Sequence, residues 1–535
     1  MRSVYDTDGL GRMAEGMLAA ADLPSGCARG IAMTSPVDPL DTRAQVADLA
    51  KIKDPAQQAY GCTPVRFVRA TRAVAPPSST MGLRSAIGET EFEQVQILGY
   101  APVEPDGSFK LQVPADTPLA LSIIDAKGRS IQTHLNWIQV RPGERRTCDG
   151  CHSPRRGASL NSGEVVNATP AGVSSALWSQ RESGETMASM RARLYGAGNP
   201  MGDSTNPLTL QADMVYSDVW ANGPGAVARA SMTVKYTGNA DPADNLATAV
   251  PTNGIINYPT HIAPLWTRDR GANTCVTCHF EAVKLDLRAT TSGTGRVTSY
   301  EELLVGDPVI DSVTGLPQIQ IREGEPEIVR GVPLVDNMVG NAMGMTRSSR
   351  LGEILYGENL KASAEARTTH PNPPGTAPNH AAMLNKAELR LVTEWMDMGG
   401  QYYNNPFDSG IAAMNPLSET VFDSTILPIL SANCAASCHQ AGGVGSTVAP
   451  GTSFQGNRFV LTGSPEGDFN VTLSMISDTC NPASNYLLLR PSTAPHPSGA
   501  ASAVMPVASA NYNTISSWIA AGCSTQTANA RTNRR

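Results

Sequence analysis

The chain has 535 residues, of which 41% are hydrophobic and 17% are charged, and its formal net charge is −7. This length exceeds what one hydrophobic core usually organises, so several domains are expected. The acidic balance and the lack of a dense Lys/Arg run argue against nucleic acid and anionic membranes as partners. No run of about 18 apolar residues occurs, so no membrane-spanning helix is predicted.

Residues 1–65 form an N-terminal segment with weak patterning and helix-like runs at 11–21 and 42–51. The first residues carry no apolar region of the kind found in secretory leaders. Because the arguments given below favour export, the sequence is expected to be a mature or truncated form.

Residues 66–160 change to short runs in which apolar and polar residues alternate, a pattern typical of β-strands. The runs cover 92–98, 108–113 and 119–124. Turn-forming sequences such as Pro105-Asp106-Gly107 separate them. The pattern predicts a β-sandwich module over 66–160.

The module ends in Cys148-Asp149-Gly150-Cys151-His152, the arrangement that attaches a haem covalently. Two thiols add to the two vinyl groups of one porphyrin, and the histidine that follows binds the iron. The same arrangement recurs twice, with one extra residue between the cysteines in the last copy: Cys275, Cys278 and His279, then Cys434, Cys438 and His439. The sequence therefore predicts three covalently attached haem c groups, called haems 1, 2 and 3 in chain order. A Cys₄ zinc site is the alternative, but it leaves the trailing histidines unexplained.

Four segments precede the first motif in a specific order: 104–109, 113–119, 125–132 and Arg141-Pro142-Gly143-Glu144. This order resembles the middle domain of the hydrazine synthase alpha subunit, and the resemblance covers roughly residues 80–160. In that family a tyrosine four residues after the motif histidine ligates the haem of the active site. The matching position here is Arg156. The resemblance therefore does not carry over the synthase activity, and the departure at Arg156 argues for an electron-transfer haem or one that is used differently.

Residues 161–250 are rich in Ser, Gly, Ala, Asn and Asp and are predicted to form a loop-rich spacer. An internal repeat follows, with 251–415 around haem 2 and 416–524 around haem 3, before a tail at 525–535. Each copy opens with an apolar helix that runs into its motif and closes with a Trp-bearing helix, at 383–399 and 505–522.

Both copies resemble the cytochrome c fold, in which the terminal helices pack around the haem. The expected fold class is therefore α+β and multidomain. It comprises an N-terminal β-sandwich module followed by two mostly α-helical cytochrome c-like domains with loop-rich insertions.

A six-coordinate iron needs a second axial ligand, and five histidines lie outside the motifs. The predicted ligands are His134 for haem 1, His380 in preference to Met383 for haem 2, and His496 in preference to Met505 for haem 3. His261 either ligates haem 1 or haem 2 or caps a helix.

Four cysteines remain outside the motifs, and they fall as one pair near each end of the chain. Haem attachment takes place outside the cytoplasm, where disulfides also persist. We therefore predict the disulfides Cys27–Cys62 and Cys480–Cys523 and a periplasmic or extracellular location.

Three attachment sites, with no hydrolytic or nucleotide-binding motif, favour an electron carrier. Its expected partners are redox proteins or an extracellular acceptor, and one subform self-assembles as a homopolymer, an extracellular cytochrome filament. No catalytic residue is predicted, so the protein is expected not to be an enzyme. The alternative is a haem enzyme that acts on a small nitrogen or oxygen species at haem 1, with haems 2 and 3 as an electron relay.

Overall fold

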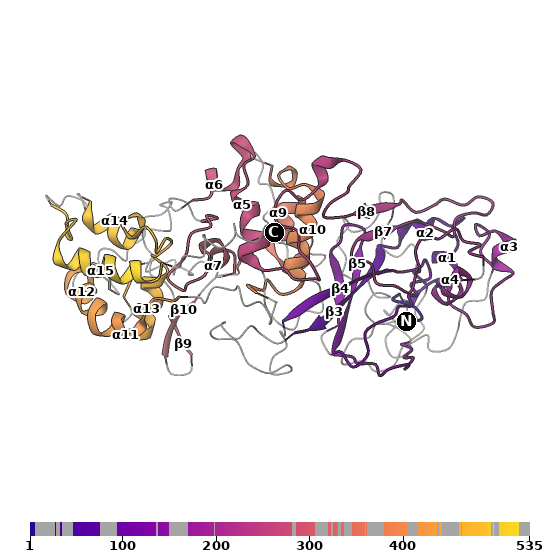
Figure 1. The fold of residues 1–535 in the computed structure, drawn as a ribbon, viewed down its shortest axis with the longest axis horizontal. Helices are drawn as coiled ribbons and strands as arrows, with labels where there is room; N and C mark the ends of the chain where they lie inside the picture. Colours follow the sequence, from indigo (N-terminus) through magenta and orange to yellow (C-terminus); the bar gives the residue numbers. More distant parts are fainter. Residues whose placement is uncertain are drawn as a thin grey trace, which may run out of the picture. The chain divides into compact units, whose positions relative to one another are not determined.

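The computed structural model forms two compact units, each of which is built from separate stretches of the chain (Figure 1). Unit 1 contains Met1–Ala75, Ser85–Ile256 and Val335–Asn404, and unit 2 contains Pro76–Arg84, Asn257–Leu334 and Asn405–Arg535. The structure describes residues 1–5, 27, 33–34, 46–74, 94–134, 137–148, 169–196, 198–280, 285–304, 319–322, 325–329, 333–335, 345–358, 360, 379–403, 415–435, 438–440, 459–461, 463–493, 496 and 502–523.

An antiparallel sheet of four strands organises unit 1. Its strands are β3 (Val65–Ala73), β4 (Val95–Pro102), β5 (Leu119–Asp125) and β6 (Ser130–Thr133), in the spatial order β4-β3-β5-β6. The central strand β3 is buried along most of its length, and its neighbours pair with it along seven residues each. Its β-branched and aromatic residues suit such a pleated surface.

The predicted strands at 92–98 and 119–124 are confirmed as β4 and β5, whereas the prediction of a strand at 108–113 is wrong. The backbone of this segment bonds to distant loops, since Phe109 N–H donates to the Met1 carbonyl and Gln112 N–H to the Leu208 carbonyl. The segment therefore joins no ladder. The described part of 66–160 contains one four-stranded sheet and no second sheet to pack on it. The helices lie in other stretches of unit 1, so the predicted β-sandwich is corrected to a mixed α/β arrangement.

Short elements flank this sheet. They are the paired strands β1 (Met33–Thr34) and β2 (Val46–Ala47), the helices α1 (Leu49–Ile52), α2 (Gln58–Cys62), α3 (Ser175–Trp178) and α4 (Met187–Tyr195), the paired strands β7 (Met214–Tyr216) and β8 (Met232–Val234), and the 3₁₀ turn η3 (Pro242–Asp244). The segment predicted as a loop-rich spacer thus contains regular elements. It also has a core of its own, in which the Trp178 and Trp220 rings meet edge to face.

Unit 1 is completed by α8 (Met345–Ser348), α9 (Arg350–Tyr356), η6 (His380–Ala382) and α10 (Lys386–Asp397). Asn385 caps α10 in a reciprocal pair with Glu388, and Gly399 and Gly400 end it with positive φ values of 89° and 64°. The predicted Trp-bearing helix at 383–399 is therefore confirmed. Because it lies in unit 1, the interval 251–415 contributes to both units.

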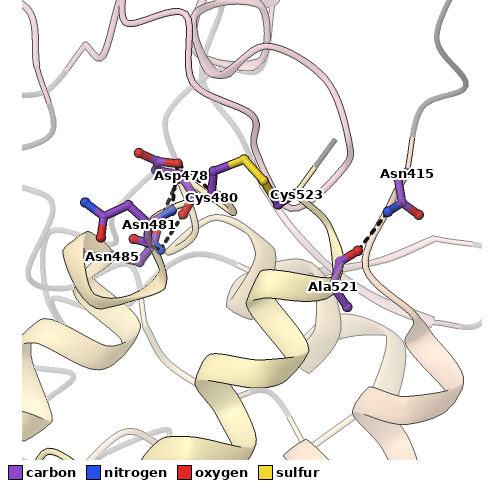
Figure 2. Close-up of a disulfide and its surroundings, with 7 residues drawn as sticks. All are labelled: Asn415, Asp478, Cys480, Asn481, Asn485, Ala521 and Cys523. Atoms are coloured by element: carbon purple, nitrogen blue, oxygen red, sulfur yellow. Dashed lines mark hydrogen bonds between the residues drawn. A yellow bond between two sulfur atoms is a disulfide. The ribbon is translucent and has the colours of Figure 1, made fainter. Parts of the chain in front are cut away.

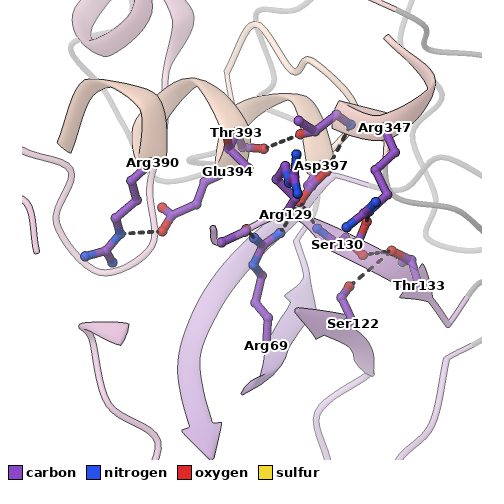
Figure 3. Close-up of polar contacts among 12 residues, drawn as sticks. Arg69, Ser122, Arg129, Ser130, Thr133, Arg347, Arg390, Thr393, Glu394 and Asp397 are labelled. Atoms are coloured by element: carbon purple, nitrogen blue, oxygen red, sulfur yellow. Dashed lines mark hydrogen bonds and ion pairs between the residues drawn. The ribbon is translucent and has the colours of Figure 1, made fainter. Parts of the chain in front are cut away.

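Buried charges fix α10 to the sheet (Figure 3). Glu394 accepts from Arg390 Nε and from the Tyr100 hydroxyl, both at 2.7 Å. Arg69 on β3 pairs with Asp397 at 3.1 Å. Carboxylates this deeply buried are tolerated because each has a charged partner and further hydrogen bonds.

Unit 2 contains two groups of helices. The first comprises the π-helical turn η4 (Tyr258–Ile262), α5 (Ala263–Thr267), the 3₁₀ turn η5 (Gly271–Asn273), α6 (Cys275–Cys278) and α7 (Thr298–Leu304), with the hairpin β9 (Ile319–Arg322) and β10 (Glu325–Ile328). The second comprises α11 (Glu419–Val421), η7 (Phe422–Ile426), α12 (Leu427–Leu430), η8 (Ser431–Ala435), α13 (Pro465–Leu473), η11 (Pro482–Ser484), α14 (Tyr486–Ser492) and α15 (Ala510–Ala521).

The predicted closing helix at 505–522 is confirmed as α15. Its buried face carries Ile515, Trp518 and Ile519, which pack with Phe422 and Leu488 in one apolar core. The predicted helix that runs into a cysteine motif is confirmed in the second group, where η8 contains Cys434. In the first group α5 ends at Thr267, before the motif that begins at Cys275.

Both predicted disulfides, Cys27–Cys62 and Cys480–Cys523, are present. The second ties the end of α15 to the loop after α13, beside the hydrogen bond from Asn415 Nδ2 to the Ala521 carbonyl (Figure 2). Within the described ranges, none of the helices combines the length and the apolar character needed to cross a bilayer.

Candidate functional site

The third cysteine motif begins with Cys434 in the last turn of η8. His439 N–H donates to the Cys434 carbonyl at 3.0 Å, so the first cysteine and the histidine are close along the backbone. Burial raises the pKa of the Cys434 thiol to about 11, with a smaller contribution from Cys438. Burial of Cys434 therefore disfavours its thiolate, the form in which a cysteine binds a metal ion.

A backbone carbonyl orients the imidazole of His439. His439 Nδ1 lies 2.7 Å from the carbonyl oxygen of Phe459. A carbonyl only accepts, so Nδ1 carries the proton and Nε2 keeps its lone pair. Metal-ligating histidines commonly have this arrangement, because the outer hydrogen bond fixes both the tautomer and the direction of the ring. Burial lowers the pKa of His439, which favours the neutral, ligating form.

The ring of His496 lies opposite that of His439. The ring centres are 6.0 Å apart and the ring planes are inclined by 14°. Two imidazoles that share one metal ion through bonds of about 2.0–2.1 Å have ring centres roughly 6 Å apart. The donor types and the separation therefore fit a metal held between two histidines. Met505, the alternative ligand, is instead buried in the apolar core that includes Leu488 and Ile515.

The second motif forms the short helix α6, and His279 N–H donates to the Cys275 carbonyl at 2.9 Å. Cys278 is exposed, and His279 is half-buried. The predicted distal candidates His380 and Met383 lie in unit 1, whereas this motif lies in unit 2. Which of the two ligates haem 2 stays a prediction.

His261 caps the first turn of η4. Asn257 N–H donates to His261 Nδ1 at 2.9 Å. Burial lowers the pKa of His261 to about 4, so the ring is neutral at pH 7 and carries its single proton on Nε2. With Nδ1 accepting a hydrogen bond and Nε2 protonated, neither nitrogen offers a lone pair to iron. Of the two roles left open for this residue, the geometry favours the helix cap.

In the first motif, Cys148 is exposed and its carbonyl accepts from Arg2 N–H at 2.8 Å. Cys151, His152 and Arg156 lie outside the described residues. His134 is exposed at the end of β6, and its N–H donates to the Leu121 carbonyl at 2.8 Å. Its predicted role as the ligand of haem 1 stays a prediction.

One contributor to the third site gave no signal in the sequence. Phe459 acts through its carbonyl, a group that every residue has, and it is 20 residues from His439. Only the fold shows that the two lie together. The pairing of Cys27 with Cys62 and of Cys480 with Cys523, by contrast, was predicted from their even number and their placement as one pair near each end of the chain, and the structure confirms it.

Comparison with known proteins identifies one segment. Residues 61–153 match the protein family described as "Hydrazine synthase alpha subunit middle domain". The hydrazine synthase subunit alpha of Kuenenia stuttgartiensis is 37% identical over 99 residues, which are 16% of this chain and 12% of the relative. The solved structure of Kuenenia stuttgartiensis hydrazine synthase has a TM-score of 0.33 and 19% identity, covering 70% of this chain and 42% of that chain.

These findings confirm the predicted resemblance of the module to the middle domain, and the matched segment includes the whole first cysteine motif and ends one residue after His152. The family match covers residues 61–153, and the likeness of 251–415 and 416–524 to cytochrome c stays a prediction. The chain therefore spans about an eighth of the length of the curated relative that it matches.

The predicted role as an electron carrier, with its filament subform, is corrected here, and so is the expectation that the protein is not an enzyme. The matched relative is a subunit of a synthase, which points to an enzyme. Neither the number of haem motifs nor Arg156 distinguishes an electron carrier from an enzyme. A relay of haems is as useful to an enzyme that consumes or releases electrons as it is to a carrier.

Proposed function

We propose that this protein is a haem enzyme that acts on a small nitrogen or oxygen species at the first cysteine motif, while the second and third motifs form an electron relay. The observation that carries the proposal is the match of residues 61–153 to the hydrazine synthase middle domain, which places the first motif at the end of the matched segment. The substrate and the overall activity belong to the proposal, because only a small part of the relative is matched.

In this proposal, Cys148, Cys151 and His152 hold the reactive cofactor at the end of the sheet-bearing module. A haem supplies one-electron chemistry and, where one axial position is open, a binding position for a small ligand. This role requires that His134, the predicted second ligand of haem 1, does not bind the iron. The module contributes a rigid support, since the central strand β3 is buried and paired on both sides. A rigid support keeps the attached group in a fixed position during reaction.

The third motif is proposed to hold its cofactor from both faces. Cys434 and Cys438 provide the covalent attachment, and His439 and His496 the two axial nitrogens. Three features support this assignment: the 6.0 Å separation of the rings, the proton held on His439 Nδ1 by Phe459, and the burial of Met505 in the core. A site closed on both faces passes electrons and admits no substrate.

The second motif is proposed to complete the relay through Cys275, Cys278 and His279, with His380 or Met383 as the second axial ligand. The two disulfides support export to a periplasmic or extracellular compartment. Redox proteins are then the expected partners of the relay.

Optical and paramagnetic resonance spectra of the purified holoprotein test the proposal, together with the mass of the intact chain. We expect three haems per chain, two low-spin and one high-spin, and the high-spin haem should bind cyanide or nitric oxide. Three low-spin haems that bind neither ligand would overturn the enzymatic role. A mass equal to that of the bare polypeptide would overturn haem attachment itself.

Substitution of the two candidate ligands assigns the third site. His496→Ala should convert one further haem to the high-spin form, since it removes one axial nitrogen. Met505→Leu, the matched control, keeps the volume in the core and should leave all spin states unchanged. The reverse result would show that Met505 is the ligand.

A further inference from the structure

The loop 141–148 leads from the sheet to the first motif and carries an unusual concentration of positive charge. It contains Arg141, Arg145 and Arg146 against a single acid, Glu144, in a chain whose net charge is −7. All eight of its residues are exposed. We call Arg141, Arg145 and Arg146 the arginine patch.

Glu144 forms an ion pair with one guanidinium of the patch, that of Arg146, and the charge of Arg141 also acts on this carboxylate without forming an ion pair. Glu144 accepts from Arg146 Nε at 3.2 Å and from the Arg141 backbone N–H at 2.7 Å. The side chain of Arg146 also remains about half exposed. Among the residues that the structure describes, the guanidinium groups of Arg141 and Arg145 have no ion-pair partner. The guanidinium groups of Arg141 and Arg145 are therefore exposed to solvent on the loop that ends at Cys148.

The shape of the patch favours a large partner over a small anion. A small anion is held by donors that converge on one point, usually in a concave and partly buried site. These arginines lie on an exposed loop. Their guanidinium groups can each bind a carboxylate with two hydrogen bonds, which suits several carboxylates spread over the surface of a partner. Opposite charge on two facing surfaces speeds association and orients the encounter.

We propose that the arginine patch docks an acidic electron-carrier protein and brings its redox centre next to the first motif. The inference rests on the proposed function in one respect, namely that the first motif holds a haem. In the docked complex the reduced carrier loses one electron and this protein gains it. No bond forms or breaks.

Stopped-flow reduction of the full-length holoprotein by reduced flavodoxin, an acidic carrier, tests the docking. The wild-type second-order rate constant should fall as the salt concentration rises from about 0.02 M to 0.5 M, because screening shortens the reach of the charges. Arg141→Glu/Arg145→Glu should lower the rate constant at low salt by about tenfold or more and remove most of its salt dependence.

A matched control changes the charge by the same amount elsewhere. Lys110→Glu/Lys386→Glu alters two exposed lysines of unit 1 and should change the rate constant by less than about twofold. Arg141→Gln/Arg145→Gln gives an intermediate loss and guards against a fold defect in the charge-reversed variant. Circular dichroism and the haem spectrum establish that each variant is folded and loaded.

A wild-type rate constant in the charge-reversed variant, with haem present at the first motif by mass analysis, would overturn the docking surface and leave the proposed function standing. An unchanged rate constant combined with weaker nitrite binding would assign the patch to a small anion and also overturn it. If peptide mass analysis finds no haem at Cys148 and Cys151, the proposed function itself fails.

Discussion

Two Trp-bearing helices, α10 in unit 1 and α15 in unit 2, look equivalent in sequence but are held by different forces. Each has 12 residues and a buried tryptophan on its apolar face. α10 contains five charged residues, and its Arg390 and Glu394 are buried against tyrosines and arginines. α15 contains no charged residue and packs in an apolar core.

The difference shows that apolar spacing predicts a helix but not the surface that it contacts. A helix with buried charges needs a surface with complementary charges, and the sheet offers Arg69 and the Tyr100 hydroxyl. A helix without charges needs only apolar surface, and its end is additionally tied by a disulfide. Unit 1 thus depends on electrostatic matching at this contact and unit 2 on burial and covalent restraint.

The largest expected effect concerns the covalent restraint in unit 2. Cys480→Ala/Cys523→Ala opens a loop that spans 43 residues and should lower the free energy of unfolding by about 4 kcal/mol, since the unfolded chain gains conformational entropy. Urea denaturation followed by circular dichroism measures the loss. Unchanged stability in the variant would show that apolar packing alone holds α15.

A smaller loss is expected when the electrostatic contact of α10 is broken. Glu394→Ala leaves the buried Arg390 without its main partner and should cost about 3 kcal/mol. The value lies at the low end for buried ion pairs because Arg390 keeps Asp213 at 3.0 Å. Glu182→Ala, at an exposed acid in unit 1, is the control and should change stability by less than about 0.5 kcal/mol. Equal effects of the two variants in urea denaturation would contradict the comparison.

The smallest expected effect concerns the pH dependence of stability in unit 1, which arises from a buried charged group. Burial lowers the pKa of Lys53 to about 8, from about 10.4 in an unfolded chain. The folded state therefore loses stability wherever the ammonium is present. This penalty is full below about pH 8 and disappears as the pH rises to about 10.4.

Wild type should consequently gain up to about 2 kcal/mol relative to Lys53→Met between pH 7.5 and pH 10, after allowance for solvent screening. Urea denaturation of both proteins at the two pH values measures the difference. Lys110→Met, at an exposed lysine of the same unit, should show no such gain. A parallel pH profile for wild type and Lys53→Met would mean that Lys53 is well solvated.

Local pattern predicted part of the fold well. The alternating runs at 92–98 and 119–124 form strands, and the apolar spacing near Trp395 and Trp518 forms helices, because these patterns reflect one buried face of a regular element. The run at 108–113 alternates equally well but has no neighbouring strand, since its backbone bonds to Met1 and Leu208. Alternating apolar and polar residues show that a segment can form a strand. To join a sheet, the segment also needs an unpaired strand edge close to it.

The candidate site divides in the same way. The sequence by itself determined the positions of the three cysteine motifs, because covalent attachment fixes residue types and short spacings. It also predicted the two disulfides, whose cysteines are 35 and 43 residues apart, from the number of remaining cysteines and their placement near the two ends. Only the tertiary structure decided that His496 faces His439, that His261 caps η4, and that α10 joins the sheet. These outcomes depend on hydrogen bonds and buried charges between segments far apart in the chain. A local sequence pattern does not predict which distant groups come into contact.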